Sequence, residues 1–301
     1  MATRAQMEAT YNYMDEYFRL SLGENADIDA AWYDGNYAKT LEQAQEDKHE
    51  HVLRMLNIGP GSRLLDIGSG WGPFLKAARQ RGAHGVGLTL STKQAATCRR
   101  GGFEVYIRDW KTVTAGTFGT FDGIVCIGAF EHFCSKQEFD AGKQEAIYEH
   151  FFRLCHELLR DGGRLYLQTG VWGTRPVKFE DISVKAKRGS DEYVVACLMR
   201  FYEGTWPPLS KEQLLRVAGP YFRLIDSNNG RLDYIETLEQ WGKHNYALTP
   251  AKVLAFVKML RYFAIDRDFR YKLECLRGGY TKVGFRRQIF DHERLFFEKV
   301  S

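Results

Sequence analysis

The chain has 301 residues, of which 44% are hydrophobic and 27% charged, and its formal net charge is +4. These values are typical of a folded globular protein and exclude the disordered, fibrous and strongly basic nucleic-acid-binding classes. No apolar run approaches the roughly 18 residues of a membrane span, and the opening residues lack the apolar core of a signal peptide. We expect a cytoplasmic protein that binds no nucleic acid.

The predicted elements alternate through the first half of the chain. A helix over 40–56 starts at a capping box formed by Thr40 and Gln43. Short apolar runs then predict strands, and helical segments separate them. Runs that are apolar throughout suit strands covered on both faces, and their alternation with helices implies right-handed crossovers in a parallel sheet. The pattern predicts an α/β, doubly wound fold with strands at 63–67, 86–90, 103–107, 123–128 and 164–170, and helices at 72–82, from Ser91 and at 137–160.

The alternation breaks after Gly170. Residues 171–219 are rich in aromatic residues, proline and glycine, and we interpret them as an insertion over the sheet and not as a second domain. Helical spacing returns at 251–263. Residues 285–300 mix alternation with β-branched and aromatic residues, and we expect them to close the sheet as its last one or two strands.

A glycine-rich loop follows the first predicted strand. That strand contains Asp66, and Gly68, Gly70 and Gly72 then alternate before Pro73, a residue suited to the first turn of a helix. Glycines at this point permit a tight turn and close approach of a ligand to the backbone. The spacing is GxGxG and not the GxGxxG of dinucleotide sites, and no acidic residue follows the second strand to bind a ribose. The loop therefore predicts a ligand that lies close to the backbone, and its spacing disfavours NAD.

The cysteines form no CxxC pair and no compact framework. This spacing predicts reduced, mostly structural thiols, without disulfides or a metal site. The six residues are Cys98, Cys126, Cys134, Cys155, Cys197 and Cys275.

An acidic residue and an imidazole, Glu131 and His132, directly follow the apolar run 124–130. A charge at the end of a water-excluding strand indicates a functional site at the edge of the sheet. The alternative is structural: Glu131 caps the start of a helix, and His132 hydrogen-bonds a neighbouring backbone group. The residues alone leave both interpretations open.

Five blocks, in this order, resemble the cyclopropane fatty acid synthase and mycolic acid synthase family, within the class I S-adenosylmethionine-dependent methyltransferases. They lie at 11–23, 30–72, 86–94, 124–133 and 233–241. The resemblance implies a Rossmann-like seven-stranded sheet with an N-terminal helical lid and an insertion after the fifth strand. It also implies one domain over 1–301, divided into a helical cap (1–58), a cofactor-binding half (59–170), an insertion over the active site (171–219) and C-terminal helices and closing strands (220–301).

The resemblance also implies where S-adenosylmethionine binds and where its product, S-adenosylhomocysteine, forms. Gly68 and Gly70 would lie against the cofactor, with Asp66 supporting the loop. Thr89 and Gln94 would serve the ribose region.

The adenine would meet Asp109 and Trp110, with Ile127 packed against it. The residues are compatible with this, because a flat base favours an apolar or aromatic face and an acceptor for its amino group. The alternative for Trp110 is plain core packing.

In the family, a bicarbonate ion believed to act as the base is surrounded by Glu, Cys, His, Ile and Tyr. Glu131 and Tyr234 match this set, whereas Ala30, Gln168 and Gly170 stand at the Cys, His and Ile positions. Alanine's side chain offers no hydrogen bond, and glutamine does not titrate near neutral pH. Bicarbonate binding is therefore in doubt, and His132 or Tyr234 is a candidate for the missing base.

Methyl transfer to an alkene gives a carbocation, which a carboxylate and aromatic faces stabilise before a base removes a proton. We therefore favour C-methylation of an unsaturated lipid, isoprenoid or similar apolar acceptor, with Glu131 as charge stabiliser and Tyr234 as its partner. The alternatives are N-methylation of a small amine, a true cyclopropane synthase with a modified base, and a non-catalytic protein that has lost its chemistry.

Aromatic residues indicate an apolar acceptor pocket. We expect a lid helix from the N-terminal segment and a wall from the insertion, with core packing as the alternative for many of these side chains. We expect no membrane span and at most peripheral contact with a membrane or a carrier; the oligomeric state is left open. The residues are Tyr11, Tyr13, Tyr17, Phe18 and Arg19 in the lid, and Trp172, Phe201, Tyr202 and Trp206 in the wall.

Overall fold

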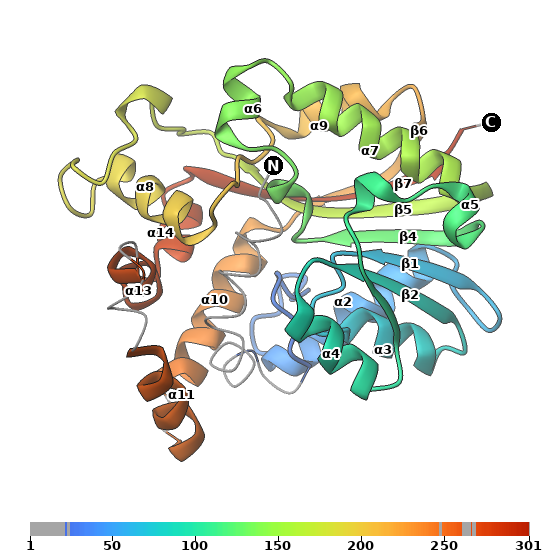
Figure 1. Ribbon diagram of the computed structural model, residues 1–301, viewed down its shortest axis with the longest axis horizontal. Coiled ribbons are helices and arrows are strands. Elements are labelled where there is room, and N and C mark those ends of the chain that lie inside the picture. Colours follow the sequence, from blue (N-terminus) through green and yellow to red (C-terminus); the bar gives the residue numbers. More distant parts are fainter. Residues whose placement is uncertain (1–21, 23–24, 247–248, 261–265, 267–268, 301) are drawn as a thin grey trace.

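The centre of the molecule is a seven-stranded sheet (Figure 1). The structure is a computed structural model that describes residues 22, 25–246, 249–260, 266 and 269–300. The strand order is β3-β2-β1-β4-β5-β7-β6, in which the first five strands are parallel and β7 is antiparallel to both of its neighbours. The strands are β1 (Arg63–Ile67), β2 (His84–Thr89), β3 (Glu104–Ile107), β4 (Phe121–Ile127), β5 (Leu159–Trp172), β6 (Phe222–Asn229) and β7 (Phe290–Lys299).

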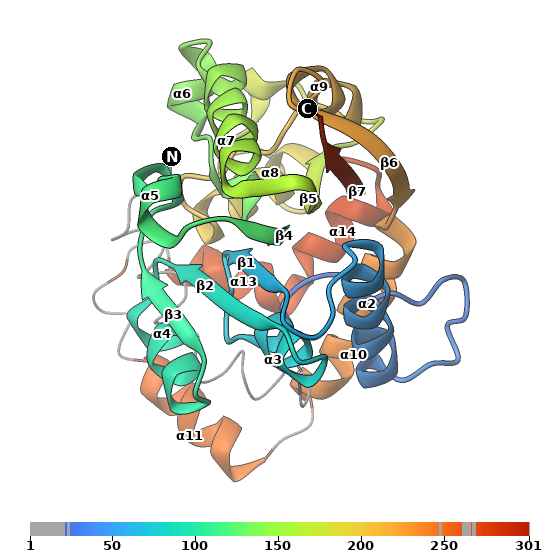
Figure 2. The ribbon, with the colours of Figure 1, turned by 90° about the vertical axis from the view of Figure 1, so that its right-hand side faces the viewer.

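Helices cover both faces of this sheet, as the two perpendicular views show (Figures 1 and 2). One face carries α2 (Leu41–Met55), α3 (Pro73–Gln80) and α4 (Thr92–Arg100), and the other carries α6 (Lys136–Asp140), α7 (Gln144–Leu158) and α9 (Lys211–Ala218). The prediction of an α/β, doubly wound, seven-stranded fold is confirmed. The remaining elements are α5 (Ala115–Phe118), α8 (Asp191–Phe201), α10 (Arg231–Tyr246), α11 (Pro250–Leu260), α13 (Phe269–Gly278) and α14 (Tyr280–Arg286), with short 3₁₀ turns η1 (Trp110–Thr112), η2 (Phe130–His132) and η3 (Phe179–Asp181).

The predicted capping box forms. Thr40 accepts the backbone N–H of Gln43 through its hydroxyl at 3.2 Å, and the Gln43 side chain accepts the backbone N–H of Thr40 at 3.0 Å. Two of the otherwise unpaired donors at the start of α2 are thereby satisfied. Of the predicted N-terminal cap at 1–58, residues 1–21 and 23–24 lie outside the described part of the chain.

One predicted helix differs from the structure, and one strand was not predicted. The helix expected over 137–160 is two helices, α6 and α7, separated at Gly142, which adopts the left-handed φ of 69°. The expectation that residues 285–300 close the sheet is confirmed by one strand, β7, which follows α14. The missing strand, β6, was not recognised because its sequence, FRLIDSNN, is mostly polar and largely exposed at the sheet edge.

The predicted insertion divides between two places. Helix α8 packs with α13 and α14 through a cluster that includes Tyr193, Phe201, Phe269 and Tyr280. Helix α9 instead packs against α7, where the Gln213 side chain donates to that of Gln144 at 3.1 Å. Within residues 171–219, α8 therefore packs with the C-terminal helices, whereas α9 packs with α7.

The cysteines are all buried thiols that form no disulfide in the structure. In the described part of the chain, no helix is long and apolar enough to cross a membrane.

Candidate functional site

A pocket opens at the carboxyl ends of β1 to β4, where the parallel topology brings four strand ends to one edge of the sheet. It holds about 780 Å³ of empty space and has a mostly apolar lining. Seven of the eight predicted cofactor residues line it, and the eighth, Asp66, lines a smaller adjoining hollow. The seven are Gly68, Gly70, Thr89, Gln94, Asp109, Trp110 and Ile127.

Gly68 and Gly70 of the glycine loop each lack a side chain for a different structural reason. Both have left-handed φ angles, 93° at Gly68 and 53° at Gly70. A Cβ on Gly68 would lie 2.5 Å from the Cβ of Ala129, whereas a Cβ on Gly70 would meet no atom within 4 Å. Gly68 therefore allows the loop to pack against the segment after β4, and Gly70 leaves open space in the pocket.

The side chains of Thr89 and Gln94 are hydrogen-bonded to each other at the end of β2. The Thr89 hydroxyl donates to the Gln94 side-chain oxygen at 2.9 Å and accepts the backbone N–H of Ser91 at 3.1 Å. The Ser91 hydroxyl in turn accepts the backbone N–H of Gln94 at 3.2 Å as the N-cap of α4. A polar edge of the pocket is thereby fixed in place.

Trp110 is both a pocket wall and a core residue. Its ring lies 4.9 Å from that of Phe133 and 5.5 Å from that of Phe151, and its indole Nε1 is buried with no partner among the described residues. Asp109 caps η1, because its Oδ1 accepts the backbone N–H of Lys111 at 3.0 Å. The cofactor and core-packing interpretations of Trp110 are thus compatible.

The smaller hollow contains buried charge that the sequence analysis did not single out. Asp27 forms ion pairs with the fully buried Lys48 at 2.7 Å and with His49 at 2.8 Å. Burial opposes ionisation, but Lys48 and His49 hold the pKa of Asp27 well below its usual range. Burial, followed by repulsion from Asp27, raises the pKa of Asp66 to about 8.

A second pocket adjoins the first and shares Ile28, Gly128 and His132 with it. It holds about 800 Å³ of empty space, and most of its exposed lining is apolar. The polar groups in its wall include Glu131 and Tyr234, two of the predicted catalytic residues. We call the first pocket the nucleoside pocket and the second the acceptor chamber.

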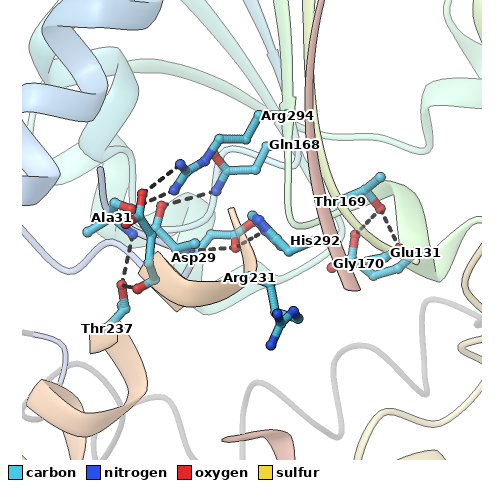
Figure 3. A network of polar contacts seen from close by, with 12 residues as sticks. Asp29, Ala31, Glu131, Gln168, Thr169, Gly170, Arg231, Thr237, His292 and Arg294 are labelled. Carbon is cyan, nitrogen blue, oxygen red and sulfur yellow. Dashed lines mark hydrogen bonds and ion pairs between the residues drawn. The ribbon is translucent and has the colours of Figure 1, made fainter. Parts of the chain in front are cut away.

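Glu131 stands in η2 at the wall of the acceptor chamber. Its Oε2 accepts the Thr169 hydroxyl of β5 at 2.9 Å, which orients the carboxyl group (Figure 3). Burial, followed by repulsion from Asp29, raises the pKa of Glu131 to about 8. A buried carboxyl group with a raised pKa in a pocket wall is typical of a functional site.

His132 lines both pockets. Its Nδ1 and the Thr205 hydroxyl oxygen lie 2.5 Å apart, so its ring partner is a side chain and not the backbone group of the structural alternative. Burial lowers the pKa of His132 to about 4 although Asp29 opposes this shift. The imidazole is therefore neutral at physiological pH.

Of the five positions that correspond to the family's bicarbonate site, three line the acceptor chamber and two do not. Glu131, Gly170 and Tyr234 line the acceptor chamber, whereas Ala30 and Gln168 are fully buried and line neither pocket. The Gln168 amide donates to the Ala30 carbonyl at 3.1 Å and accepts the hydroxyl of the neighbouring Tyr166 at 2.6 Å. Both the nitrogen and the oxygen of the Gln168 side chain therefore have hydrogen-bond partners within the protein.

Asp29 is a chamber residue that the sequence analysis missed. Its Oδ1 accepts the backbone N–H of Ala30 at 2.6 Å and lies 3.2 Å from Nε2 of His292 in β7 (Figure 3). No local pattern marks it, because its partner His292 is 263 residues away in the sequence.

The predicted aromatic wall is mostly core. Tyr202 lines the acceptor chamber, whereas Trp172, Phe201 and Trp206 lie in buried clusters outside its lining. The predicted lid residues between 11 and 19 fall outside the described residues. Within the described ranges, no group of three or more metal-binding side chains occurs.

Comparisons with known proteins identify the family of this chain. The family profile described as "Mycolic acid cyclopropane synthetase" matches residues 2–263. Cyclopropane mycolic acid synthase 3 of Mycobacterium tuberculosis is 31% identical over 288 residues, covering 92% of this chain and 94% of that protein. The solved structure of the cyclopropane synthase MmaA2 from the same organism matches with a TM-score of 0.76 and 26% identity over 98% of both chains. The mycolic acid cyclopropane synthase CmaA1, complexed with SAH and CTAB, matches with a TM-score of 0.78 and 24% identity over 98% of both chains.

These matches confirm the predicted family, fold class and enzyme class. The chain belongs to the mycolic acid cyclopropane synthetase family of S-adenosylmethionine-dependent methyltransferases.

Proposed function

We propose that this protein transfers a methyl group from S-adenosylmethionine to a double-bond carbon of an unsaturated lipid, isoprenoid or similar apolar acceptor. The observation that carries the proposal is the shared wall between the nucleoside pocket and the acceptor chamber, formed by Ile28, Gly128 and His132. Because the two pockets adjoin at these residues, a cofactor in one and a methyl acceptor in the other would lie next to each other, away from bulk water. Alignment and water exclusion are the main demands of methyl transfer.

The nucleoside pocket fits the cofactor. The open space at Gly70 suits a ligand that lies against the backbone. The indole ring of Trp110, whose Nε1 has no hydrogen-bond partner among the described residues, suits a flat base. We assign Thr89 and Gln94 to the ribose region and Asp109 to the adenine. When bound, the cofactor supplies an electrophilic methyl group on a sulfonium.

The acceptor chamber fits an apolar chain. Leu198, Met199, Phe285 and Phe290 contribute to its wall, and burial of a hydrocarbon chain against such side chains is favourable. We infer that this wall selects the acceptor by its hydrocarbon part.

The chamber also fits the charge that the reaction creates. Glu131 and the rings of Tyr202 and Tyr234 line it together, so an acceptor cation would lie among a carboxyl group and aromatic faces. Repulsion between Asp29 and Glu131 contributes to the raised pKa of Glu131, and a positive charge between them would relieve that repulsion. In this proposal Glu131 stabilises the cation, with Tyr234 as its partner.

A second candidate is N-methylation of a small amine. The observation that favours it is the presence of two carboxyl groups, Asp29 and Glu131, in one apolar chamber. Such a pair binds an ammonium as well as it stabilises a carbocation.

The test is an incubation with S-adenosylmethionine that carries a trideuterated methyl group. The acceptors are vesicles of a cis-monounsaturated phospholipid, a prenyl diphosphate and a secondary amine. Three deuterium atoms on a new carbon branch support the proposal, and two indicate loss of a proton from the added methyl group, as in ring closure. Label that appears only on nitrogen would replace the proposal with the second candidate.

A matched pair of variants checks the role of Glu131 in the same assay. Glu131→Gln should lower turnover roughly 10²-fold or more, because an amide cannot ionise to stabilise the acceptor cation. Glu50→Gln, which removes an exposed carboxylate paired with Arg81, should leave turnover unchanged. Equal rates for the two variants would remove Glu131 from the mechanism.

A further inference from the structure

A second carboxyl group, Asp29, faces the acceptor chamber from the segment that precedes α2. The residue is 2% exposed, and it lines the chamber beside Glu131. Its Oδ2 is buried without a hydrogen-bond partner among the described residues. An unpaired buried carboxyl oxygen is costly unless a ligand or a proton satisfies it.

The other oxygen of Asp29 is held firmly. Oδ1 accepts the backbone N–H of Ala30 at 2.6 Å, and His292 Nε2 lies 3.2 Å away and donates in the matching tautomer (Figure 3). The His292 ring lies 4.9 Å from that of Tyr234, which also lines the chamber. These contacts fix the orientation of the Asp29 carboxyl group and leave Oδ2 as its unpaired oxygen.

The backbone of Gly128 makes room for this carboxylate. Gly128 has a left-handed φ of 63°, and a Cβ there would lie 2.5 Å from Oδ2 of Asp29. Gly128 also lines both pockets. The unpaired oxygen therefore lies at the wall between the nucleoside pocket and the acceptor chamber.

We propose that Asp29 is the base that takes a proton from the methylated acceptor, with His292 as its positioning residue. This inference rests on the proposed function. Glu131, whose carboxyl group is occupied by Thr169, stabilises the cation, and Asp29 removes the proton.

The step balances without a further reactant. The π electron pair of the acceptor forms the new carbon–carbon bond, and the carbon–sulfur pair stays on sulfur. Oδ2 of Asp29 then takes a proton from a carbon next to the cationic centre, and that C–H pair closes a double bond. Asp29 ends as a carboxylic acid and returns its proton to solvent when product leaves.

Two variants separate this role from a structural one. Asp29→Asn keeps the acceptor oxygen for Ala30 and His292 but cannot accept the proton, so it should fold normally and lose roughly 10²-fold or more in turnover. Asp29→Ala leaves a space the size of a carboxylate. Added formate should restore its turnover at least tenfold, with no effect on the wild type, on Asp29→Asn or on Glu131→Ala.

The acceptor for these assays is the cis-monounsaturated phospholipid or the prenyl diphosphate that the wild type methylates. Binding of ¹³C-formate, followed by NMR, gives a readout independent of turnover. Asp29→Ala should bind formate and the wild type should not, even if the wild type methylates neither probe. Wild-type turnover in Asp29→Asn, or a folded Asp29→Ala enzyme that neither binds nor responds to formate, would overturn the proposal.

Discussion

A substitution at Gly70, in the glycine loop after β1, should change ligand binding without disturbing the packing of the protein. A methyl group at residue 70 meets no protein atom within 4 Å and projects into open space of the nucleoside pocket. Gly61 is a matched control, because it also has a left-handed φ, 79°, and no atom within 4 Å of its Cβ, but it lines none of the three pockets described above. Alanine at either position carries the same backbone cost of roughly 1–2 kcal/mol in the free energy of unfolding.

The two variants should differ in cofactor affinity alone. If the ligand lies against residue 70, the added methyl group overpacks the complex by about 1–3 kcal/mol. This corresponds to roughly 5- to 150-fold in Kd. Gly61→Ala should bind as the wild type does, and Gly70→Arg should abolish binding.

Calorimetric titration with S-adenosylhomocysteine measures the affinity, and urea unfolding measures the stability of the same samples. The loop assignment fails if Gly70→Ala and Gly70→Arg bind with wild-type affinity. Equal losses of affinity in Gly70→Ala and Gly61→Ala would instead assign the effect to backbone strain.

Further predictions concern stability. Gly68→Ala should lower the free energy of unfolding by roughly 2–4 kcal/mol in urea titrations, because strain adds to overlap with Ala129; a loss equal to that of Gly61→Ala would contradict the packing role. Lys48→Met should cost about 3–5 kcal/mol, because it leaves Asp27 charged and buried; an unchanged melting temperature would refute this. The folded-state pKa of Glu131, about 8, lies above its ordinary value of 4.5, so the folded state binds more protons between these values and stability falls as pH rises through them. Glu131→Gln should therefore reduce the decline in unfolding free energy between pH 5 and pH 8, and an unchanged decline would exclude this contribution.

The parallel half of the fold was predictable because its strands are covered on both faces. Runs such as 86–90 and 123–128 contain no charged residue and are mostly apolar, and this signal is local. Strand β6 carries no such signal, since it is an edge strand with mostly exposed side chains, and its pairing with β7 depends on residues far along the chain. The split between α6 and α7 depends on the conformation of one glycine, Gly142, which helical spacing does not reveal.

The site divides in the same way. The residues of the nucleoside pocket were predicted from the glycine loop and the family resemblance, and they come together because the carboxyl ends of consecutive parallel strands meet at one edge of the sheet. The acceptor chamber was only partly predictable: the family resemblance supplied Glu131 and Tyr234, but not Asp29 of the N-terminal segment or its partner His292 of β7. These elements meet only through tertiary packing, and an aspartate with no motif around it gives no sequence signal.

The departures at positions 30 and 168 and the carboxylate at position 29 form one connected arrangement. The Gln168 side chain donates to the carbonyl of Ala30 and accepts the hydroxyl of Tyr166, so both its nitrogen and its oxygen have protein partners. The backbone N–H of Ala30 is taken by Oδ1 of Asp29. The backbone N–H of Ala30 and one amide N–H of Gln168 are thus used by the protein. These contacts support the proposal that Asp29, a carboxylate of the chain itself, acts as the base.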